Sequence, residues 1–155
     1  MEAEERGQAQ AIAENLLVMA QLRVPIIACV IGEGNSGGAL AIGVANRLLM
    51  LEHAYFSVVS PEGCASILWR DTAFAPQAAQ AMRITAGDLL ELRVVDEVIA
   101  EPTGGAHLAP EAAAAALKEA LARHLTELTQ LDAHELVATR HEKYRRLGTV
   151  IQELV

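Results

Sequence analysis

The sequence IIACVIGEGNSGG, residues 26–38, decides the fold of this chain. Its first part, residues 26–31, is a continuous β-prone run of the kind that lies buried on both faces of an α/β sheet. The glycine-rich part leads directly into a compact apolar run, residues 39–45. Together they predict the central strand of a sheet, a glycine-rich turn over residues 34–38, and a buried helix that begins near Ser36.

This glycine turn is expected to bind an anion through its backbone. The start of a helix exposes unpaired amides, and the helix dipole favours negative charge there. Gly37 and Gly38 lack a Cβ atom, so a thioester or ureido oxygen can approach both amides and be stabilised as charge develops in a transition state. Gly34, Asn35 and Ser36 are the expected substrate-binding residues. The alternative is that the glycines only permit tight packing of the helix on the strand.

Two other motifs overlap the same residues. GNSGG satisfies the G-x-S-x-G nucleophile elbow of α/β-hydrolases, in which Ser36 would attack the substrate. Its acidic and histidine partners would come from Asp71, Asp96 and His107, but only one clear strand follows residue 60 to carry them. The glycines also match the dinucleotide fingerprint G-x-G-x-x-G, yet no strand with a terminal acidic residue follows about 20 residues later.

The sequence around this stretch predicts alternating helices and strands, from apolar residues at helical spacing and short β-prone runs. Further strands are expected at residues 48–51, 55–59 and 94–99. Helices are expected at residues 8–22, 65–69, 76–82, 85–90, 110–128 and 133–147. No period of 20 to 50 residues repeats, which argues against a solenoid. The pattern is that of an α/β domain.

Composition excludes several classes of function. The chain has 155 residues, and 12 Lys and Arg against 20 Asp and Glu give a net charge of -8, so no nucleic-acid partner is expected. Two cysteines are too few for a disulfide framework or a four-ligand zinc site. An acidic start and the lack of apolar runs of about 20 residues predict no signal peptide and no membrane span. We expect a soluble, cytoplasmic protein without a metal.

The remaining polar residues have structural interpretations. The five histidines are scattered, which makes a metal cluster improbable. Cys64 follows a turn without a neighbouring histidine and is expected to be a packed thiol. Arg140, Lys143, Arg145 and Arg146 predict a basic C-terminal face, and such faces are most often solvated.

Several long motifs occur in order across nearly the whole chain. They are EERGQ (4–8), VIGEGNSGGALA (30–41), LEH (51–53), SPEGCA (60–65), TA-x-DLL (85–90) and EP-x-GGAH (101–107). In this combination the sequence resembles the carboxyltransferase α subunit of bacterial acetyl-coenzyme A carboxylase. Ordered motifs over such a length are far more specific than a single glycine pattern.

The resemblance implies an α/β fold of the crotonase (ClpP/crotonase) type, a spiral of β-β-α units that is partial here and carries a C-terminal helical extension. Residues 1–105 would be the C-terminal part of the core, and residues 106–155 a helical segment that packs on the core or on a partner. The implied activity belongs to fatty acid biosynthesis. It transfers the carboxyl group of carboxybiotin, held on a biotin carboxyl carrier protein, to acetyl-coenzyme A and forms malonyl-coenzyme A.

The resemblance also implies partners and roles for residues. A β subunit shares the active site in an α2β2 assembly and carries the family's zinc, so no metal is implied in this chain. The amides of Gly37 and Gly38 would form the oxyanion hole for the biotin oxygen. An alternative is a non-catalytic assembly module of the same fold.

Two departures from the family pattern stand out. Asn35 replaces a glycine, which is tolerable because Asn adopts left-handed conformations more readily than most residues. Family members also carry an N-terminal half with a Pro-Gly-rich loop just before the EERG segment, and Met1 falls almost at that point. The chain is therefore expected to be a truncated or excised form that is inactive alone.

Overall fold

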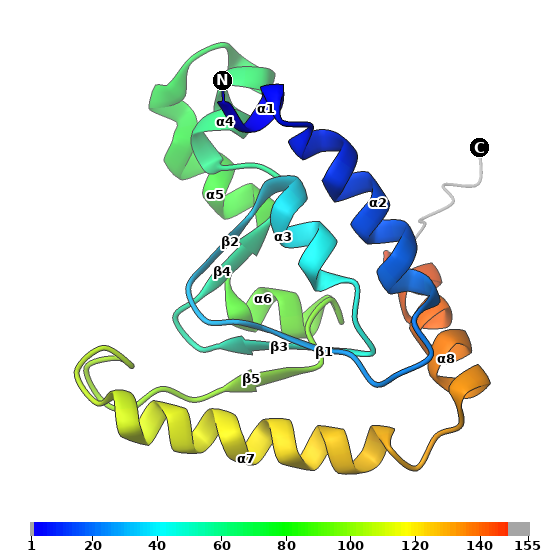
Figure 1. Ribbon diagram of the computed structural model, residues 1–155. Coiled ribbons are helices and arrows are strands. Elements are labelled where there is room, and N and C mark those ends of the chain that lie inside the picture. The colour runs from blue at the N-terminus through cyan, green and yellow to red at the C-terminus, as the bar shows by residue number, and fades with distance from the viewer. Residues whose placement is uncertain (1, 149–155) are drawn as a thin grey trace, which may run out of the picture.

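A computed structural model describes residues 2–148 (Figure 1). The strands are β1 (Ile27–Val30), β2 (Glu33–Asn35), β3 (Arg47–Leu51), β4 (Tyr55–Ser57) and β5 (Glu97–Ile99). The helices are α1 (Glu2–Glu5), α2 (Gln8–Gln21), α3 (Ser36–Gly43), α4 (Pro61–Trp69), the 3-10 helix η1 (Thr72–Phe74), α5 (Ala75–Met82), α6 (Ala86–Glu91), α7 (Pro110–Leu128) and α8 (Ala133–Arg145). The predicted alternation of helices and strands is confirmed.

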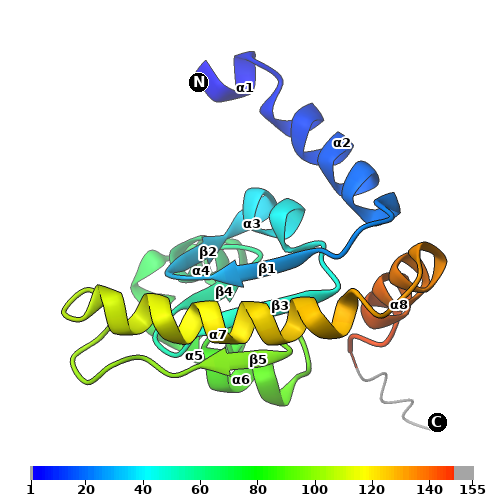
Figure 2. The same ribbon diagram turned by 60° about the horizontal axis from the view of Figure 1, so that its bottom comes forward.

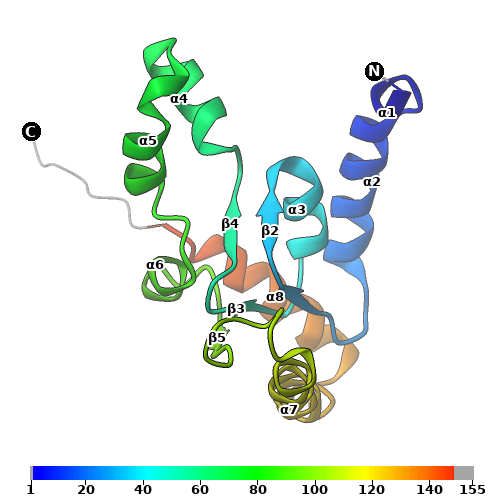
Figure 3. The same cartoon turned by 90° about the vertical axis from the view of Figure 1, so that its left-hand side faces the viewer.

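The strands form two parallel sheets through a repeated strand-strand-helix unit. β1, β2 and α3 make one unit, and β3, β4 and α4 make the next. The first strand of each unit joins a sheet of order β1-β3-β5, and the second strands pair as β2-β4. Ile27 lies opposite Arg47 in the first sheet, and Glu33 lies opposite Tyr55 in the second. Figure 3 shows β2 and β4 side by side, apart from β3.

The central strand is β3, and the prediction that residues 26–31 hold this position is wrong. β3 lies between β1 and β5, and its residues 48–51 are all buried. Among residues 2–148, β1 pairs with β3 alone. Ala28 is accordingly its sole buried residue, and Ile31, just beyond it, is 67% exposed. A run of apolar residues predicts a strand but does not specify how many neighbours the strand has.

The long helix α7 packs on the three-stranded sheet, against β1 and β5 (Figure 2). A carboxylate on β5, that of Glu97, accepts hydrogen bonds from Arg123 at 2.7 Å and lies 2.6 Å from His124 Nε2. The hydrogen bond from Arg123 and the contact with His124 hold the pKa of Glu97 below its usual value. These contacts fix α7 on the sheet, while the proposed boundary between residues 105 and 106 stays a prediction.

The basic C-terminal face is only partly solvated, in contrast to the prediction. Arg140 is fully buried, and Lys143 forms an ion pair with Asp96 at the start of β5. Burial lowers the pKa of Lys143. Arg145 and Arg146 are exposed as expected. Charged side chains at helical spacing therefore point inward here, because α8 lies across the ends of α2 and α3.

The start of α6 agrees with the sequence prediction, whereas the start of the following strand does not. The helix expected over residues 85–90 is present, and Thr85 caps it, since the Thr85 hydroxyl accepts a hydrogen bond from the Asp88 amide. The strand expected over residues 94–99 begins only at Glu97. The amides of Val94 and Val95 are bound to the carbonyl of Leu89 at the end of α6, so they cannot join the sheet.

Candidate active site

The passage from β2 into α3 is sharper than the predicted turn. Residues 33–35 form a strand, and the helix begins at the very next residue. That residue is Ser36, with φ of +63°, in the left-handed region that costs most non-glycine residues about 1–2 kcal/mol. Asn35 is extended, with φ of −136°. Asn35 therefore does not adopt the left-handed conformation that asparagine tolerates. The residue with strained backbone is Ser36.

Replacing Ser36 by glycine is expected to stabilise the protein by about 1 kcal/mol, because glycine adopts positive φ without the steric cost. Urea unfolding of the Ser36→Gly variant measures the change. A loss of stability would mean that the Ser36 side chain makes a contribution larger than the backbone strain.

The amides of Gly37 and Gly38 lie in the first turn of α3, where a helix has no internal acceptors for its N–H groups. The Asn35 side chain does not cap them; its Oδ1 instead accepts a hydrogen bond from Ser57 Oγ at 3.1 Å. A Cβ atom on Gly37 would lie 3.7 Å from Ile12 of α2, whereas one on Gly38 would meet no atom within 4 Å. Gly38 therefore has open space on its Cβ side.

Gly34 has a different physical role. A Cβ atom here would lie 2.8 Å from Phe56 Cδ2 and 3.0 Å from Val30 Cγ1. The same ring lies 3.3 Å from the Cβ position of Gly43. Phe56 is thus boxed between two glycines, and the alternative explanation of the glycine run, tight packing, applies to Gly34 but not to Gly38.

The Gly34→Ala variant is expected to lose about 1–3 kcal/mol of stability, the usual cost of overpacking a core. Gly38→Ala is the matched control for stability, since its added methyl group has free space and alanine favours a helix. Thermal or urea unfolding compares the two. Equal stability of both variants would contradict the packing role of Gly34.

A hollow of about 350 Å³ runs along the open edge of β1 and β2. Its lining comprises residues 28–35, Ala39, Ile42, Gly43, Leu48 and Phe56. Burial raises the pKa of Cys29 in this lining to about 11, so its thiol is not an activated nucleophile.

The predicted site residues divide around this hollow. Gly34 and Asn35 line it, whereas Ser36, Gly37 and Gly38 begin the adjoining helix outside the lining. The sequence reasoning missed the contribution of Phe56 and Ile42, since no local pattern relates Phe56 in the second unit to Gly34 in the first.

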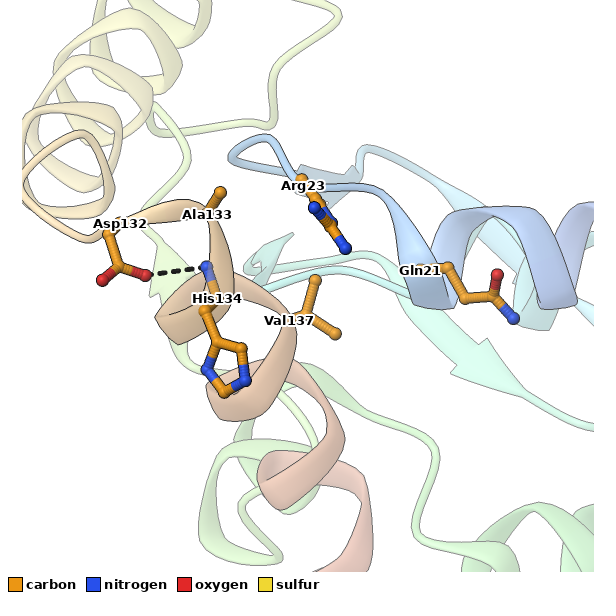
Figure 4. Close-up of a pocket in the computed structure, with 6 residues that line it drawn as sticks. All are labelled: Gln21, Arg23, Asp132, Ala133, His134 and Val137. Carbon is orange, nitrogen blue, oxygen red and sulfur yellow. Dashed lines mark hydrogen bonds between the residues drawn. The ribbon is translucent and has the colours of Figure 1, made fainter.

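A second hollow, of about 620 Å³, lies between the end of α2 and the start of α8 (Figure 4). Its lining residues are Gln21, Arg23, Asp132, Ala133, His134 and Val137. Asp132 caps α8 by accepting from the amides of His134 at 2.7 Å and Glu135 at 2.8 Å. The helix start therefore has its own anion, and none of the predicted site residues lies here.

The hydrolase interpretation lacks its catalytic partner. Among residues 2–148, no hydrogen bond or ion pair connects Ser36 to a histidine; His124 contacts Glu97 and His141 contacts the Ala20 carbonyl instead. In the same part of the chain, no three His, Cys, Asp or Glu side chains are grouped so as to hold a metal ion. The helices that the structure describes are too short or too polar to cross a bilayer.

Comparison with known proteins identifies close relatives in sequence. A family model described as acetyl co-enzyme A carboxylase carboxyltransferase-like matches residues 1–148. The acetyl-coenzyme A carboxylase carboxyl transferase subunit alpha of Synechococcus sp. (strain CC9311) is 62% identical over 97% of this chain and 46% of that protein. The subunit alpha of Deinococcus radiodurans is 58% identical over 96% of this chain and 47% of that protein. The chain spans about half the length of the curated relatives it matches.

Solved structures share the fold at lower identity. A Pseudomonas malonate decarboxylase hetero-tetramer in complex with coenzyme A has a TM-score of 0.72 at 20% identity, over 94% of this chain and 60% of that chain. Transcarboxylase 12S has a TM-score of 0.66 at 19% identity, over 84% of this chain and 23% of that chain. The expected fold, a crotonase-like spiral of β-β-α units with C-terminal helices, is confirmed.

Proposed function

This chain belongs to the acetyl-coenzyme A carboxylase carboxyltransferase family, and we propose that it provides the α-subunit side of a carboxyltransferase active site. The reaction moves the carboxyl group of carboxybiotin to acetyl-coenzyme A and yields malonyl-coenzyme A for fatty acid biosynthesis in the cytoplasm. The high identity to subunits alpha of this enzyme supports the proposal.

The observation that carries the proposed role is the open space on the Cβ side of Gly38, at a helix start whose first amides are not capped by the Asn35 side chain. The amides of Gly37 and Gly38 donate hydrogen bonds to the ureido oxygen of biotin, on which negative charge develops as the carboxyl group leaves. Such donors are already oriented before the reaction, and removal of one typically costs about 3–4 kcal/mol of barrier. Gly34 and Asn35 shape the hollow beside this point, and Ser36 sets the direction of the helix.

Biotin on its carrier protein supplies the carboxyl group in this scheme. The residues present fit that group, because a backbone oxyanion site needs donors and free space rather than a charged side chain. A β subunit completes the site and binds the acetyl thioester, in an α2β2 assembly. No metal is assigned to this chain.

The test is carboxyl transfer from malonyl-coenzyme A to biotin with the β subunit added. We expect the complete α subunit together with the β subunit to transfer carboxyl groups at a rate well above that of the β subunit alone. Stable binding to the β subunit without such a rate would sink the catalytic role and favour the non-catalytic assembly module. If the chain neither binds the β subunit nor raises the rate, both the catalytic role and the assembly module are wrong.

The serine hydrolase is the remaining alternative. Ser36 lies at a strained turn between a strand and a helix, as a nucleophile would, but it has no histidine partner among the described residues. A fluorophosphonate probe is therefore expected to leave Ser36 unlabelled, as read by mass spectrometry of the tryptic peptide. Labelling at this serine would revive the hydrolase.

A further inference from the structure

The C-terminal end of α3 is held by a residue from another helix. α3 has eight residues, and it ends without a left-handed residue or a capping backbone amide: Val44 has φ of −70° and ψ of 88°. The last carbonyls of a helix need partners from outside it. At this end Asn15 of α2 donates to the carbonyl of Ala41 at 3.1 Å, and a residue of α8 donates to the carbonyl of Gly43, the last residue of α3.

The partner is the hydroxyl of Tyr144. It donates to the carbonyl of Gly43 at 2.6 Å and accepts from the amide of Ala45 at 2.9 Å. The carbonyl of Ala45, at 3.1 Å, is a second acceptor within reach. Burial raises the pKa of Tyr144, which keeps the hydroxyl protonated and able to donate. The Tyr144 side chain thus pairs with the carbonyl of the last residue of α3 and with an amide two residues beyond the helix.

Arg140, one turn earlier on α8, holds the neighbouring chain segments. Its guanidinium donates to Asn46 Oδ1 at 2.8 Å, just after α3, and to the carbonyl of Leu22 at 2.8 Å, just after α2. Figure 1 shows α8 beside the ends of both helices. α2 in turn places Ile12 against Gly37. α8 therefore holds the ends of both α2 and α3, in addition to the contacts that β4 makes with Gly34 and Asn35.

We propose that Tyr144 is a positioning residue for the amides of Gly37 and Gly38, a role that rests on the proposed oxyanion site. A helix is stiff along its axis, and the eight residues of α3 span only about 12 Å at 1.5 Å per residue. A tilt permitted at Gly43 is transmitted to the first turn. Displacements of about 1 Å at a reacting centre typically cost about a hundredfold in rate, so a smaller loosening is already measurable.

The experiment replaces Tyr144 by phenylalanine in the complete α subunit assembled with its β subunit. Two quantities are measured: hydrogen exchange of the α3 amides, and kcat and KM for carboxyl transfer. We expect exchange in α3 to become about tenfold faster and kcat to fall about tenfold, with KM unchanged. Arg145→Ala is the matched control, because Arg145 is exposed on the same helix; its exchange and kinetics should equal those of the parent.

The two readouts separate this proposal from the proposed function. Unchanged exchange in α3 overturns the role of Tyr144, and so does faster exchange with unchanged kcat. A parent complex that transfers carboxyl groups while Tyr144→Phe changes neither quantity leaves the function standing without this positioning residue. A rise of KM alone also overturns it, because positioning of a transition-state donor acts on kcat.

Discussion

Replacing Gly38 by valine is expected to lower kcat for carboxyl transfer by about a hundredfold or more, the typical effect of losing an oxyanion donor. A Cβ atom at this position would meet no atom of another part of the chain within 4 Å, so we expect the fold to accept the side chain. The added methyl groups would fill the space through which a ligand oxygen reaches the two amides. Helix content by circular dichroism and assembly with the β subunit should stay unchanged.

The matched control for this variant is Gly87→Val. Gly87 lies in the first turn of α6, is exposed, and likewise has no atom within 4 Å of its Cβ position. Both variants carry the same cost of a β-branched residue in a helix. A kcat of Gly38→Val within about threefold of Gly87→Val would show that the amides of α3 are not the oxyanion site.

Replacing Arg140 by methionine is expected to destabilise the protein by about 3–5 kcal/mol, because several buried acceptors lose their donor at once. Arg140 is fully buried and donates to the carbonyls of Met19, Ala20, Leu22 and Val24 and to Asn46 Oδ1. Methionine fills similar volume but leaves these acceptors without their donor, each at about 1–3 kcal/mol.

Urea unfolding of Arg140→Met and of its control Arg145→Met measures this effect. Arg145 is exposed on the same helix, so its replacement should change stability by less than about 0.5 kcal/mol. A loss below about 1 kcal/mol for Arg140→Met would mean that water replaces the guanidinium at these carbonyls. The stability of residues 19–24 would then not depend on contacts with α8.

Local signals in the sequence predicted most of the elements. The helical spacing of apolar residues located α2 and α7, and short β-prone runs located β1 and β3. These features depend on residues within one or two turns of each other. These elements could therefore be recognised without knowing which other parts of the chain pack against them.

Such local signals did not predict how the strands pair. β1 was expected at the centre of the sheet and lies at its edge, and the strand β2 was hidden within a run that is glycine-rich. Three residues form a strand there because residues 55–57 lie alongside them in parallel. A partner that distant in the chain leaves no mark on local periodicity.

The sequence by itself determined the family, the alternation of strands and helices, and the position of the glycine-rich helix start. The tertiary structure alone decided what each glycine does: Gly34 makes room for Phe56, and Gly38 faces open space. It also turned Arg140 and Tyr144 of α8 inward, so that they hold the ends of α2 and α3, while Arg145 and Arg146 stay exposed. The reason is physical, since free space, burial and hydrogen-bond partners depend on residues that meet only after folding.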